Sequence, residues 1–396
     1  MSAEWPLRFG VAYAPIHNPR INPARHLQRD VEQIVRLEEL GFDEVWVGEH
    51  HSTGYEIIGS PEVFLAHVAA KTQRIKLGTG VISVPYHHPF MICERMVLLD
   101  HLSHGRAVMG LGPGALPTDV AMWGIDPMQT RPRLAQGIEA IIALLKYDGR
   151  VTMKTDWFEL KDACLQLRPY QESGMEIVVT ALTSAAGPAL AGRLGVSMLS
   201  LSAGDAIAAG VLGKHWSIVE EQAAEHGTMV SRRNWRLATP MHIAETEEQA
   251  RREVAYGMNS WRDYRKLGPL SAEFPRDANP DDFVDYLVGS GTAVIGTPDQ
   301  AIDQVRKIQE LSGGFGTFLL WAHDWAANDA TMRSYELFAH HVMPVFQDQT
   351  ESTIDAEHWL KLHSEEGFRK ATAARAQSTA DYEASRGGQK PRTVTA

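Results

Sequence analysis

The chain has 396 residues, 44% of them hydrophobic and 22% charged, which is enough apolar material to bury one large core within the size range of an elaborated α/β barrel. The formal net charge of -11 argues against sequence-independent nucleic-acid binding, which depends on lysine and arginine displacing counterions from phosphates, so we expect a small-molecule ligand. The two cysteines argue against a disulfide framework, and the absence of a basic head before an apolar run at the start argues against an export signal. No stretch of about 18 uninterrupted apolar residues occurs, which argues against a membrane span. We therefore expect a cytoplasmic protein.

Strand and helix patterns alternate through the first part of the chain. Residues 8–14 alternate in polarity, and the apolar residues of 27–40 mark one helical face that stops at Gly41. The next strand is predicted at 42–48, and Ser60-Pro61 opens the following helix with a capping residue and a proline at its first position. Further strands are predicted at 75–82 and 106–111, with helices at 92–102 and 131–145.

This alternation is interrupted once and then resumes. Residues 149–172 show short polar and apolar alternation, which we interpret as an insertion before the next strand. Strands are then predicted at 176–180, 196–201, 235–243 and 316–321, and helices at 188–194, 206–226, 247–261 and 298–311. About eight strand-plus-helix units indicate a parallel sheet, and this number favours closure into a (β/α)8 TIM barrel over an open doubly wound sheet.

Two segments do not fit the barrel pattern. Residues 262–291 are rich in Gly, Pro and Asp and are too long for an ordinary barrel loop, so they are a candidate lid. Beyond residue 362 the composition turns to Ala, Arg, Ser, Thr and Gly, which predicts a flexible tail or an oligomer arm at 363–396. We therefore expect one barrel domain at 1–362 followed by a C-terminal tail.

Four motifs occur in one ordered series: Glu49-His50-His51, Ser60-Pro61-Glu62, Lys76-Leu77-Gly78-Thr79-Gly80-Val81 and Tyr86-His87-His88-Pro89. This series resembles the bacterial luciferase-like flavin-dependent monooxygenases, and the resemblance covers roughly Arg8 to Phe346. Within that family the chain is most similar to members described as limonene monooxygenases, through Val84 to Pro89 and Gly112 to Pro117.

The resemblance implies a two-component monooxygenase. In such an enzyme a separate flavin reductase supplies reduced FMN, O₂ adds to give a flavin C4a-(hydro)peroxide, and one oxygen atom passes to an organic substrate. A homodimer is expected from the family alone. Aromatic residues near the predicted strand ends suit a small apolar substrate of the terpenoid or cyclic-ketone type, and they suit an ordinary core nearly as well; these are Trp123, Trp261, Phe274 and Trp321.

His50 is the candidate catalytic residue. It follows a strand whose C-terminal end should lie at the barrel mouth, and since consecutive strand residues face opposite sides, only one of His50 and His51 can face that mouth. Taken alone, such a pair is more often structural. The resemblance places the first histidine beside the flavin ring, which implies that His50 hydrogen-bonds the flavin peroxide.

Gly80 and Val81 are candidate cofactor-binding residues. Glycine packs nothing in a strand, so Gly78 and Gly80 indicate close approach of the backbone to another surface, or else a simple bulge. The resemblance implies a non-proline cis peptide between Gly80 and Val81, packed against the flavin.

Arg131, Thr183 and Ser184 are candidate phosphate-binding residues. Arg131 begins a predicted helix and matches a family arginine that reaches the flavin phosphate, for which a forked guanidinium is well suited. Thr183 and Ser184 precede another helix, where hydroxyls and backbone amides can bind an anion or simply cap the helix. The sequence departs from the luciferase pattern at Gly112 and Pro113, where luciferase has a cysteine and then an arginine.

Four other interpretations fit parts of the sequence. Gly110 to Ala115 fits the glycine pattern of a dinucleotide-binding turn, but no uninterrupted helix follows it. The histidines of the two His-His pairs suggest a metal hydrolase, although their spacing matches no common ligand signature, and we expect no metal. A deazaflavin (F420)-dependent oxidoreductase of the same fold and a non-enzymatic flavin-binding protein remain as alternative functions.

Overall fold

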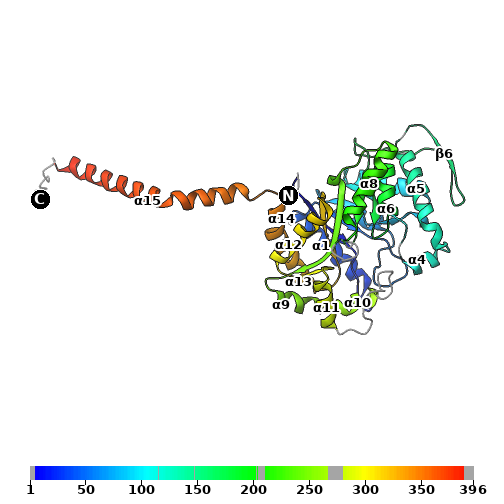
Figure 1. Ribbon diagram of the computed structural model, residues 1–396, viewed down its shortest axis with the longest axis horizontal. Helices are drawn as coiled ribbons and strands as arrows, with labels where there is room; N and C mark the ends of the chain where they lie inside the picture. Colours follow the sequence, from blue (N-terminus) through cyan, green and yellow to red (C-terminus); the bar gives the residue numbers. More distant parts are fainter. Residues whose placement is uncertain are drawn as a thin grey trace, which may run out of the picture. The chain divides into compact units, whose positions relative to one another are not determined.

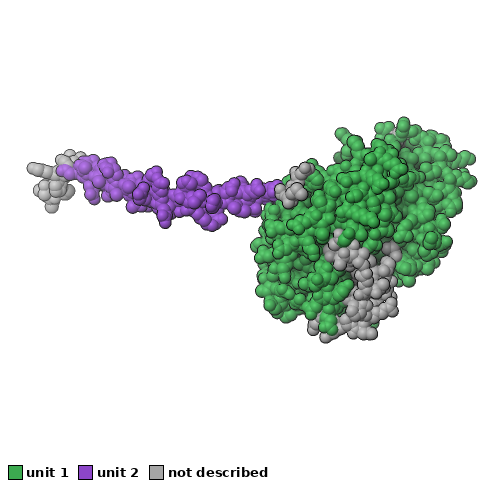
Figure 2. All heavy atoms as spheres, in the orientation of Figure 1, with its two compact units in different colours: residues 1–347 green, residues 348–396 purple. Residues whose placement is uncertain are grey.

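The structure is a computed structural model that describes residues 5–114, 116–146, 148–201, 203, 210–265 and 280–387. It divides into two compact units, residues 1–347 and 348–396 (Figure 2). Among the described residues no helix is both long enough and apolar enough to cross a membrane.

The first unit is a closed barrel of eight parallel strands (Figure 1). Neighbouring strands pair in chain order, and β12 pairs with both β10 and β1, which closes the barrel. The predicted (β/α)8 barrel is therefore confirmed. Its strands are β1 (Arg8–Tyr13), β2 (Glu44–Val47), β3 (Lys76–Thr79), β5 (Ala107–Gly112), β8 (Ile177–Ala181), β9 (Ser197–Ser200), β10 (Trp235–Ile243) and β12 (Thr317–Ala322).

Two short strands extend this sheet without being part of the closed ring. β4 (Ile82–Ser83) pairs with the end of β5, and β11 (Val294–Gly296) pairs with the end of β10. The sequence pattern placed 82 inside a longer strand and did not predict β11, since three residues are too few to show periodicity.

Helices surround the strands (Figure 1). Many of them begin at a proline, whose fixed φ suits the first helical position and whose missing N–H would have no partner there. The α-helices are α1 (Pro23–Glu39), α2 (Pro61–Ala69), α3 (Pro89–Leu102), α4 (Pro117–Met122), α5 (Thr130–Lys146), α6 (Ala186–Leu194), α8 (Leu212–His226), α9 (Glu247–Val254), α10 (Met258–Arg265), α11 (Pro280–Gly289), α12 (Pro298–Ser312), α13 (Asn328–Leu337) and α14 (Met343–Phe346). Short 3₁₀ helices occur at Val84–Tyr86, Pro127–Gln129 and Arg232–Asn234, and a π-helical turn occurs at Phe338–Val342.

The helix predicted at 247–261 is two helices, α9 and α10, that break at Gly257. The Gly257 amide donates to the Trp325 carbonyl at 2.7 Å, and a Cβ at Gly257 would lie 1.7 Å from the Asp324 carbonyl oxygen. The chain therefore bends there because its backbone packs directly against the loop after β12. Periodicity alone does not report such a contact.

The inside of the barrel has an apolar layer above a charged one. The apolar layer consists of Ala12, Trp46, Val108, Val178, Leu199, Ala238 and Leu319. Below it, Arg236 contacts Glu44 at 2.7 Å and Glu176 at 2.8 Å, and its guanidinium lies 4.9 Å from the centre of the Trp46 ring. Because these charged residues stand at or near the start of their strands, they close the N-terminal end of the barrel.

The segments outside the barrel pattern have separate structures. Residues 149–172 contain an antiparallel hairpin of β6 (Val151–Lys154) and β7 (Glu159–Ala163). Of the candidate lid at 262–291, residues 266–279 lie outside the described residues. The second unit contains α15 (Glu351–Arg386), a helix of 36 residues with none buried, so the domain boundary expected after 362 falls inside this helix.

Candidate active site at the barrel mouth

A cavity of about 170 Å³ lies at the C-terminal ends of the strands, where (β/α)8 barrels place their active sites. Its walls are mainly apolar and include the indoles of Trp46, Trp261 and Trp321. The lining residues are Ala12, Tyr13, Ala14, Ile16, Trp46, Gly48, His50, Glu56, Gly80, Leu116, Leu182, Leu199, Leu201, Trp261, Tyr264, Trp321 and His323. Of the other aromatic residues singled out in the sequence, Trp123 stacks on Tyr86 outside this lining, and Phe274 lies outside the described residues.

Two glycines expose backbone to the cavity. Gly48 and Gly80 both line it, and a Cβ at Gly80 would lie 3.0 Å from Cβ of Trp46. The Gly80–Val81 peptide bond is cis, as the resemblance implies. Val81 is half-buried and does not line the cavity; its side chain lies toward Gly112, where an added Cβ would come within 2.5 Å of it.

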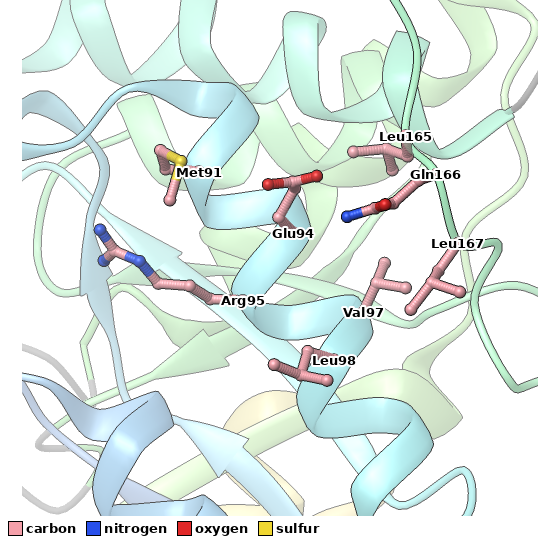
Figure 3. Close-up of a pocket in the computed structure, with 8 residues that line it drawn as sticks. All are labelled: Met91, Glu94, Arg95, Val97, Leu98, Leu165, Gln166 and Leu167. Carbon is pink, nitrogen blue, oxygen red and sulfur yellow. The ribbon is translucent and has the colours of Figure 1, made fainter.

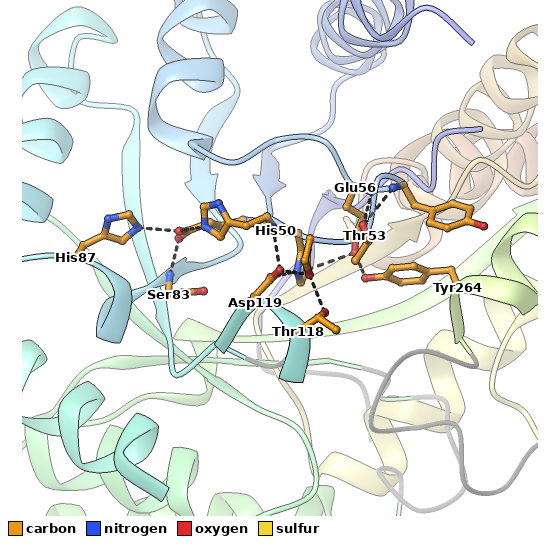
Figure 4. Close-up of polar contacts among 12 residues, drawn as sticks. His50, Thr53, Glu56, Ser83, His87, Thr118, Asp119 and Tyr264 are labelled. Atoms are coloured by element: carbon orange, nitrogen blue, oxygen red, sulfur yellow. Dashed lines mark hydrogen bonds and ion pairs between the residues drawn. The ribbon is translucent and has the colours of Figure 1, made fainter. Parts of the chain in front are cut away.

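His50 is held between two carboxylates at the edge of the cavity (Figure 4). Its Nδ1 lies 3.2 Å from Oδ2 of Asp119, and its Nε2 lies 3.3 Å from Oε2 of Glu56. Burial opposes the charged form of His50, but the nearby charges of Glu56 and Asp119 outweigh it and raise the pKa of His50 above 6.5. The geometry therefore favours a protonated His50.

Glu56 also meets the opposite wall of the cavity. The Tyr264 hydroxyl, on α10, donates a hydrogen bond to Oε2 of Glu56, the oxygen that faces His50 (Figure 4). Glu56 thus connects the loop after β2 with the helix that carries Trp261 and Tyr264.

His51 does not line the cavity, and Glu49 explains its position. Glu49 is buried and accepts hydrogen bonds from Nε2 of His51 at 2.8 Å, Nε2 of His87 at 2.7 Å and the Ser83 amide at 2.6 Å (Figure 4). The remaining histidine of the two pairs, His88, caps α3 by accepting from the Phe90 amide. Of the four histidines that suggested a metal site, His51 and His87 thus share one carboxylate and His88 caps a helix, whereas His50 lies at the edge of the cavity.

A second polar cluster lies beneath the loop after β1. Among the described residues, His17, His26 and Asp324 form a group whose spacing suits a cation, because their potential ligand atoms all lie within 4.8 Å of one another. However, Arg29 contacts Oδ2 of Asp324 at 2.6 Å, and Asp30 contacts Nε2 of His17 at 2.9 Å. A guanidinium therefore already supplies positive charge at this carboxylate.

The candidate phosphate-binding residues stand at helix starts, outside the lining of the cavity. Arg131 is exposed in the first turn of α5, and Thr183 and Ser184 are exposed just before α6. Arg193 of α6 pairs with Glu139 of α5 at 2.7 Å, so the two helices lie side by side. Because barrel helices begin near the C-terminal ends of the strands, all three residues belong to the mouth side. The residue directly before α6 is Ala185, whose side chain makes no capping hydrogen bond.

Comparison with known proteins identifies the family of this chain. Residues 7–313 match the family described as luciferase-like monooxygenase. The chain belongs to this family.

Two relatives in the luciferase-like monooxygenase family share high identity over most of their length. Limonene 1,2-monooxygenase of Rhodococcus erythropolis is 46% identical over 338 residues, which cover 85% of this chain and 86% of the relative. 4-hydroxyprotoasukamycin monooxygenase of Streptomyces nodosus subsp. asukaensis is 40% identical over 376 residues, which cover 93% of this chain and 99% of the relative. The predicted family and its similarity to limonene monooxygenases are thus confirmed, and the chain is an enzyme of this monooxygenase class.

Solved structures share the fold. The oxygenating constituent of 3,6-diketocamphane monooxygenase from Pseudomonas putida, a type II Baeyer-Villiger monooxygenase in complex with FMN, has a TM-score of 0.71 at 22% identity and covers 86% of this chain and 98% of that chain. An F420-dependent secondary alcohol dehydrogenase has a TM-score of 0.67 at 17% identity, and the match covers 85% of this chain and 98% of that chain. At these identities the likeness establishes the (β/α)8 fold of the luciferase-like monooxygenases and no more.

Three residues of this luciferase-like site were missed in the sequence: Glu56, Asp119 and Tyr264. Asp119 follows a glycine-rich turn whose pattern points to a nucleotide-binding helix, and this pattern does not indicate a partner for His50. Tyr264 and Glu56 lie 208 residues apart in the chain, so no local sequence pattern indicates that they meet. The one available signal was the carboxylate itself, six residues after His50 in a loop at the mouth.

Proposed function

We propose that the chain is the oxygenase component of a two-component, flavin-dependent monooxygenase. It would use FMN reduced by a separate flavin reductase, together with O₂, to insert one oxygen atom into a small apolar substrate of the terpenoid or cyclic-ketone type. The observation that carries this proposal is the position of His50, a polar side chain at the edge of an otherwise mainly apolar cavity whose floor exposes glycine backbone. A cytoplasmic location and a homodimer belong to the same proposal.

The residues at the mouth suit FMN. Gly48 and Gly80 present backbone without side chains to the cavity, which allows a flat ring to approach closely. Arg131, Thr183 and Ser184 are exposed on the mouth side and offer the forked donors and hydroxyls that a phosphate needs. The relatives support a separate reductase, since the trigonelline monooxygenase of Acinetobacter baylyi, 24% identical, is described as an oxygenase component.

Bound reduced FMN would supply the activation of O₂, and the protein would supply the surroundings. Trp46, Trp261 and Trp321 exclude water from the cavity and pack against an apolar substrate. His50 would donate a hydrogen bond from Nε2 to a group bound in the cavity, and Gly80 would support the ring of bound FMN. In this account Val81 acts through its backbone, because its side chain lies away from the cavity.

Limonene is the first substrate to test, because a relative 46% identical is named for it. The protein is mixed anaerobically with reduced FMN and limonene and then exposed to ¹⁸O₂, and the products are analysed by mass spectrometry. We expect a product carrying one ¹⁸O atom, and little product with His50→Ala, in which the O₂ reduced by FMN should be released as H₂O₂. Cyclic ketones and diketones form a second substrate series.

Two outcomes would contradict the proposal. If no substrate in either series acquires ¹⁸O and FMN reoxidises as it does without protein, an oxygenase function is wrong. Hydride transfer with F420 and no use of O₂ would support the deazaflavin-dependent oxidoreductase, whereas tight binding of oxidised flavin without turnover would support a flavin-binding protein.

The proposed homodimer has a candidate surface on the outside of the barrel. A shallow pocket of about 230 Å³ lies between α3 and the loop at 165–167, and apolar side chains around it are exposed, including Met91, Leu98 and Leu167 (Figure 3). Exposed apolar patches of this kind often mark protein interfaces. Light scattering should give the mass of a dimer, and Leu98→Glu should shift it toward the monomer. A monomeric wild-type protein would contradict this part of the proposal.

A further inference from the structure

The two ring nitrogens of His50 have different environments. Nδ1 forms a hydrogen bond with Oδ2 of Asp119. Nε2 forms an ion pair with Oε2 of Glu56, and among the hydrogen bonds of the described residues none joins these two atoms. A proton on Nε2 is therefore stabilised by the charge of Glu56 while it stays available to a group in the cavity.

We propose that Glu56 and Asp119 are positioning residues that together hold His50 as an imidazolium, so that Nε2 presents a proton to the cavity. This inference rests on the proposed function, because it specifies how His50 meets oxygen there. His50 would act as a charged hydrogen-bond donor, which binds a developing negative charge more strongly than a neutral donor does. It would not act as a base.

Asp119 is fixed as the anionic partner of Nδ1. Besides His50 it accepts a hydrogen bond from the His51 amide at 3.1 Å and another from the Ser52 hydroxyl. Burial alone would raise the pKa of Asp119, but the hydrogen bonds from His50 and Ser52 and the charge of His50 lower it. Asp119 is therefore ionised at neutral pH and stands at the N-terminal turn of α4, where negative charge is favoured.

Glu56 is fixed by its own loop and by the opposite wall. Oγ1 of Thr53 accepts hydrogen bonds from the Tyr55 and Glu56 amides, both at 3.1 Å, which makes a turn that aims Glu56 at the cavity. The Tyr264 hydroxyl then donates to Oε2 of Glu56, the oxygen that faces Nε2 of His50. The Glu56 side chain is only 10% exposed, so water screens its charge weakly.

The other charged and titratable groups near His50 support the same state. Glu49 lies on the same loop and adds a further negative charge that raises the pKa of His50. Across the cavity stand Tyr13 on β1, Tyr264 on α10 and His323 after β12, and the described lining contains no lysine or arginine. Within this described lining no permanent cation therefore opposes the charge on His50.

The protonation of His50 can be measured without cofactor or substrate. NMR of protein labelled with ¹³C and ¹⁵N in histidine gives the titration midpoint of each ring, and His50→Ala identifies the resonance. We expect a wild-type midpoint above 6.5. Glu56→Gln removes the charge and keeps the shape, and it should lower the midpoint by about 1 pH unit or more, as should Asp119→Asn.

Tyr264→Phe is the matched control, since it removes a hydroxyl from the same carboxylate without changing a charge. It should move the midpoint of His50 by less than about 0.3 pH unit, because the charge of Glu56 is kept. A comparable shift in this variant and in Glu56→Gln would mean that packing, and not charge, sets the state of His50, which would overturn the proposal.

Activity provides a second readout. The fraction of reduced FMN that yields oxygenated product should fall at high pH as His50 loses its proton, and in Glu56→Gln this fall should move to lower pH by the interval seen in the NMR titration. A wild-type midpoint at or below 6.5, or an unchanged midpoint in Glu56→Gln, overturns the inference. If Glu56→Gln does not fold, the wild-type titration and Asp119→Asn decide it. Loss of the proposed monooxygenase activity in every assay would leave the NMR result standing by itself.

Discussion

Replacement of Glu176 by Gln tests the charged layer at the N-terminal end of the barrel. Oε1 and Oε2 of Glu176 accept from Arg236 at 2.8 and 3.0 Å, and the Ser197 hydroxyl donates to Oε1 at 2.8 Å. Burial alone would raise the pKa of Glu176, but the charge and hydrogen bonds of Arg236 and the bond from Ser197 lower it from 4.5 to about 2.

This pKa difference sets the size of the effect. The interval between 4.5 and about 2 corresponds to about 3 kcal/mol of folding free energy at pH 7. The Glu176 side chain is 23% exposed, so solvent screens part of this, and we expect Glu176→Gln to lower the free energy of unfolding by about 1 to 3 kcal/mol. Because the folded-state pKa is lowered, the contribution is complete above pH 4.5 and is lost as the pH falls toward 2. The difference between wild type and variant should therefore shrink in that window.

The assay is urea unfolding followed by tryptophan fluorescence at pH 7, 5, 4 and 3. Glu159→Gln is the matched control, since this carboxylate is 56% exposed and pairs with Lys154 on the outer hairpin, where ion pairs contribute less than about 1 kcal/mol. A loss in Glu176→Gln below about 0.5 kcal/mol, or one that stays constant from pH 5 to pH 3, would refute the assignment of this stability to the Arg236 ion pair.

Three further predictions concern packing, thiol access and the tail. Gly110→Ala should destabilise the barrel by about 3 kcal/mol or more, because its Cβ would lie 1.9 Å from the Thr79 carbonyl oxygen. Gly289→Ala should be neutral or stabilising, because a Cβ there would have nothing within 4 Å. Thermal unfolding of the two variants compares these effects. Cys93 is buried and its pKa is raised, so a thiol reagent should modify half-buried Cys164 first and Cys93 only after unfolding. Deleting 348–396 should change the free energy of unfolding of the barrel by less than about 0.5 kcal/mol, because no residue of α15 is buried; a larger loss would contradict this prediction.

The barrel was predictable because its signals are local. Each strand and helix shows its own periodicity or cap, as at Ser60-Pro61, and the count of units selects the closed fold. The exceptions have non-local causes. The break between α9 and α10 at Gly257 depends on the carbonyl of Asp324, and β11 is too short to carry a pattern.

The site was predicted only as far as its motifs extend. The Glu49-His50-His51 motif led to His50 and to the question of which histidine faces the mouth, and the structure places His50 there. It could not reveal that Glu49 binds His51 and His87, since 38 residues separate Glu49 from His87. Arg131 and Ser184 were found through resemblance, and their part in phosphate binding stays a prediction, because both lie outside the cavity lining.

The hydrogen bond between Tyr264 and Glu56 joins two parts of the enzyme that evolution could otherwise change separately. The strand ends and their first loops carry Gly80 and His50, whereas α10, on the excursion between β10 and β12, contributes Trp261 to the cavity wall. Recombining α10 among relatives would therefore change this wall while Gly80 and His50 stay the same. The Tyr264–Glu56 contact is where such a graft would meet the loop after β2, because a replacement helix would lie against the carboxylate that faces His50.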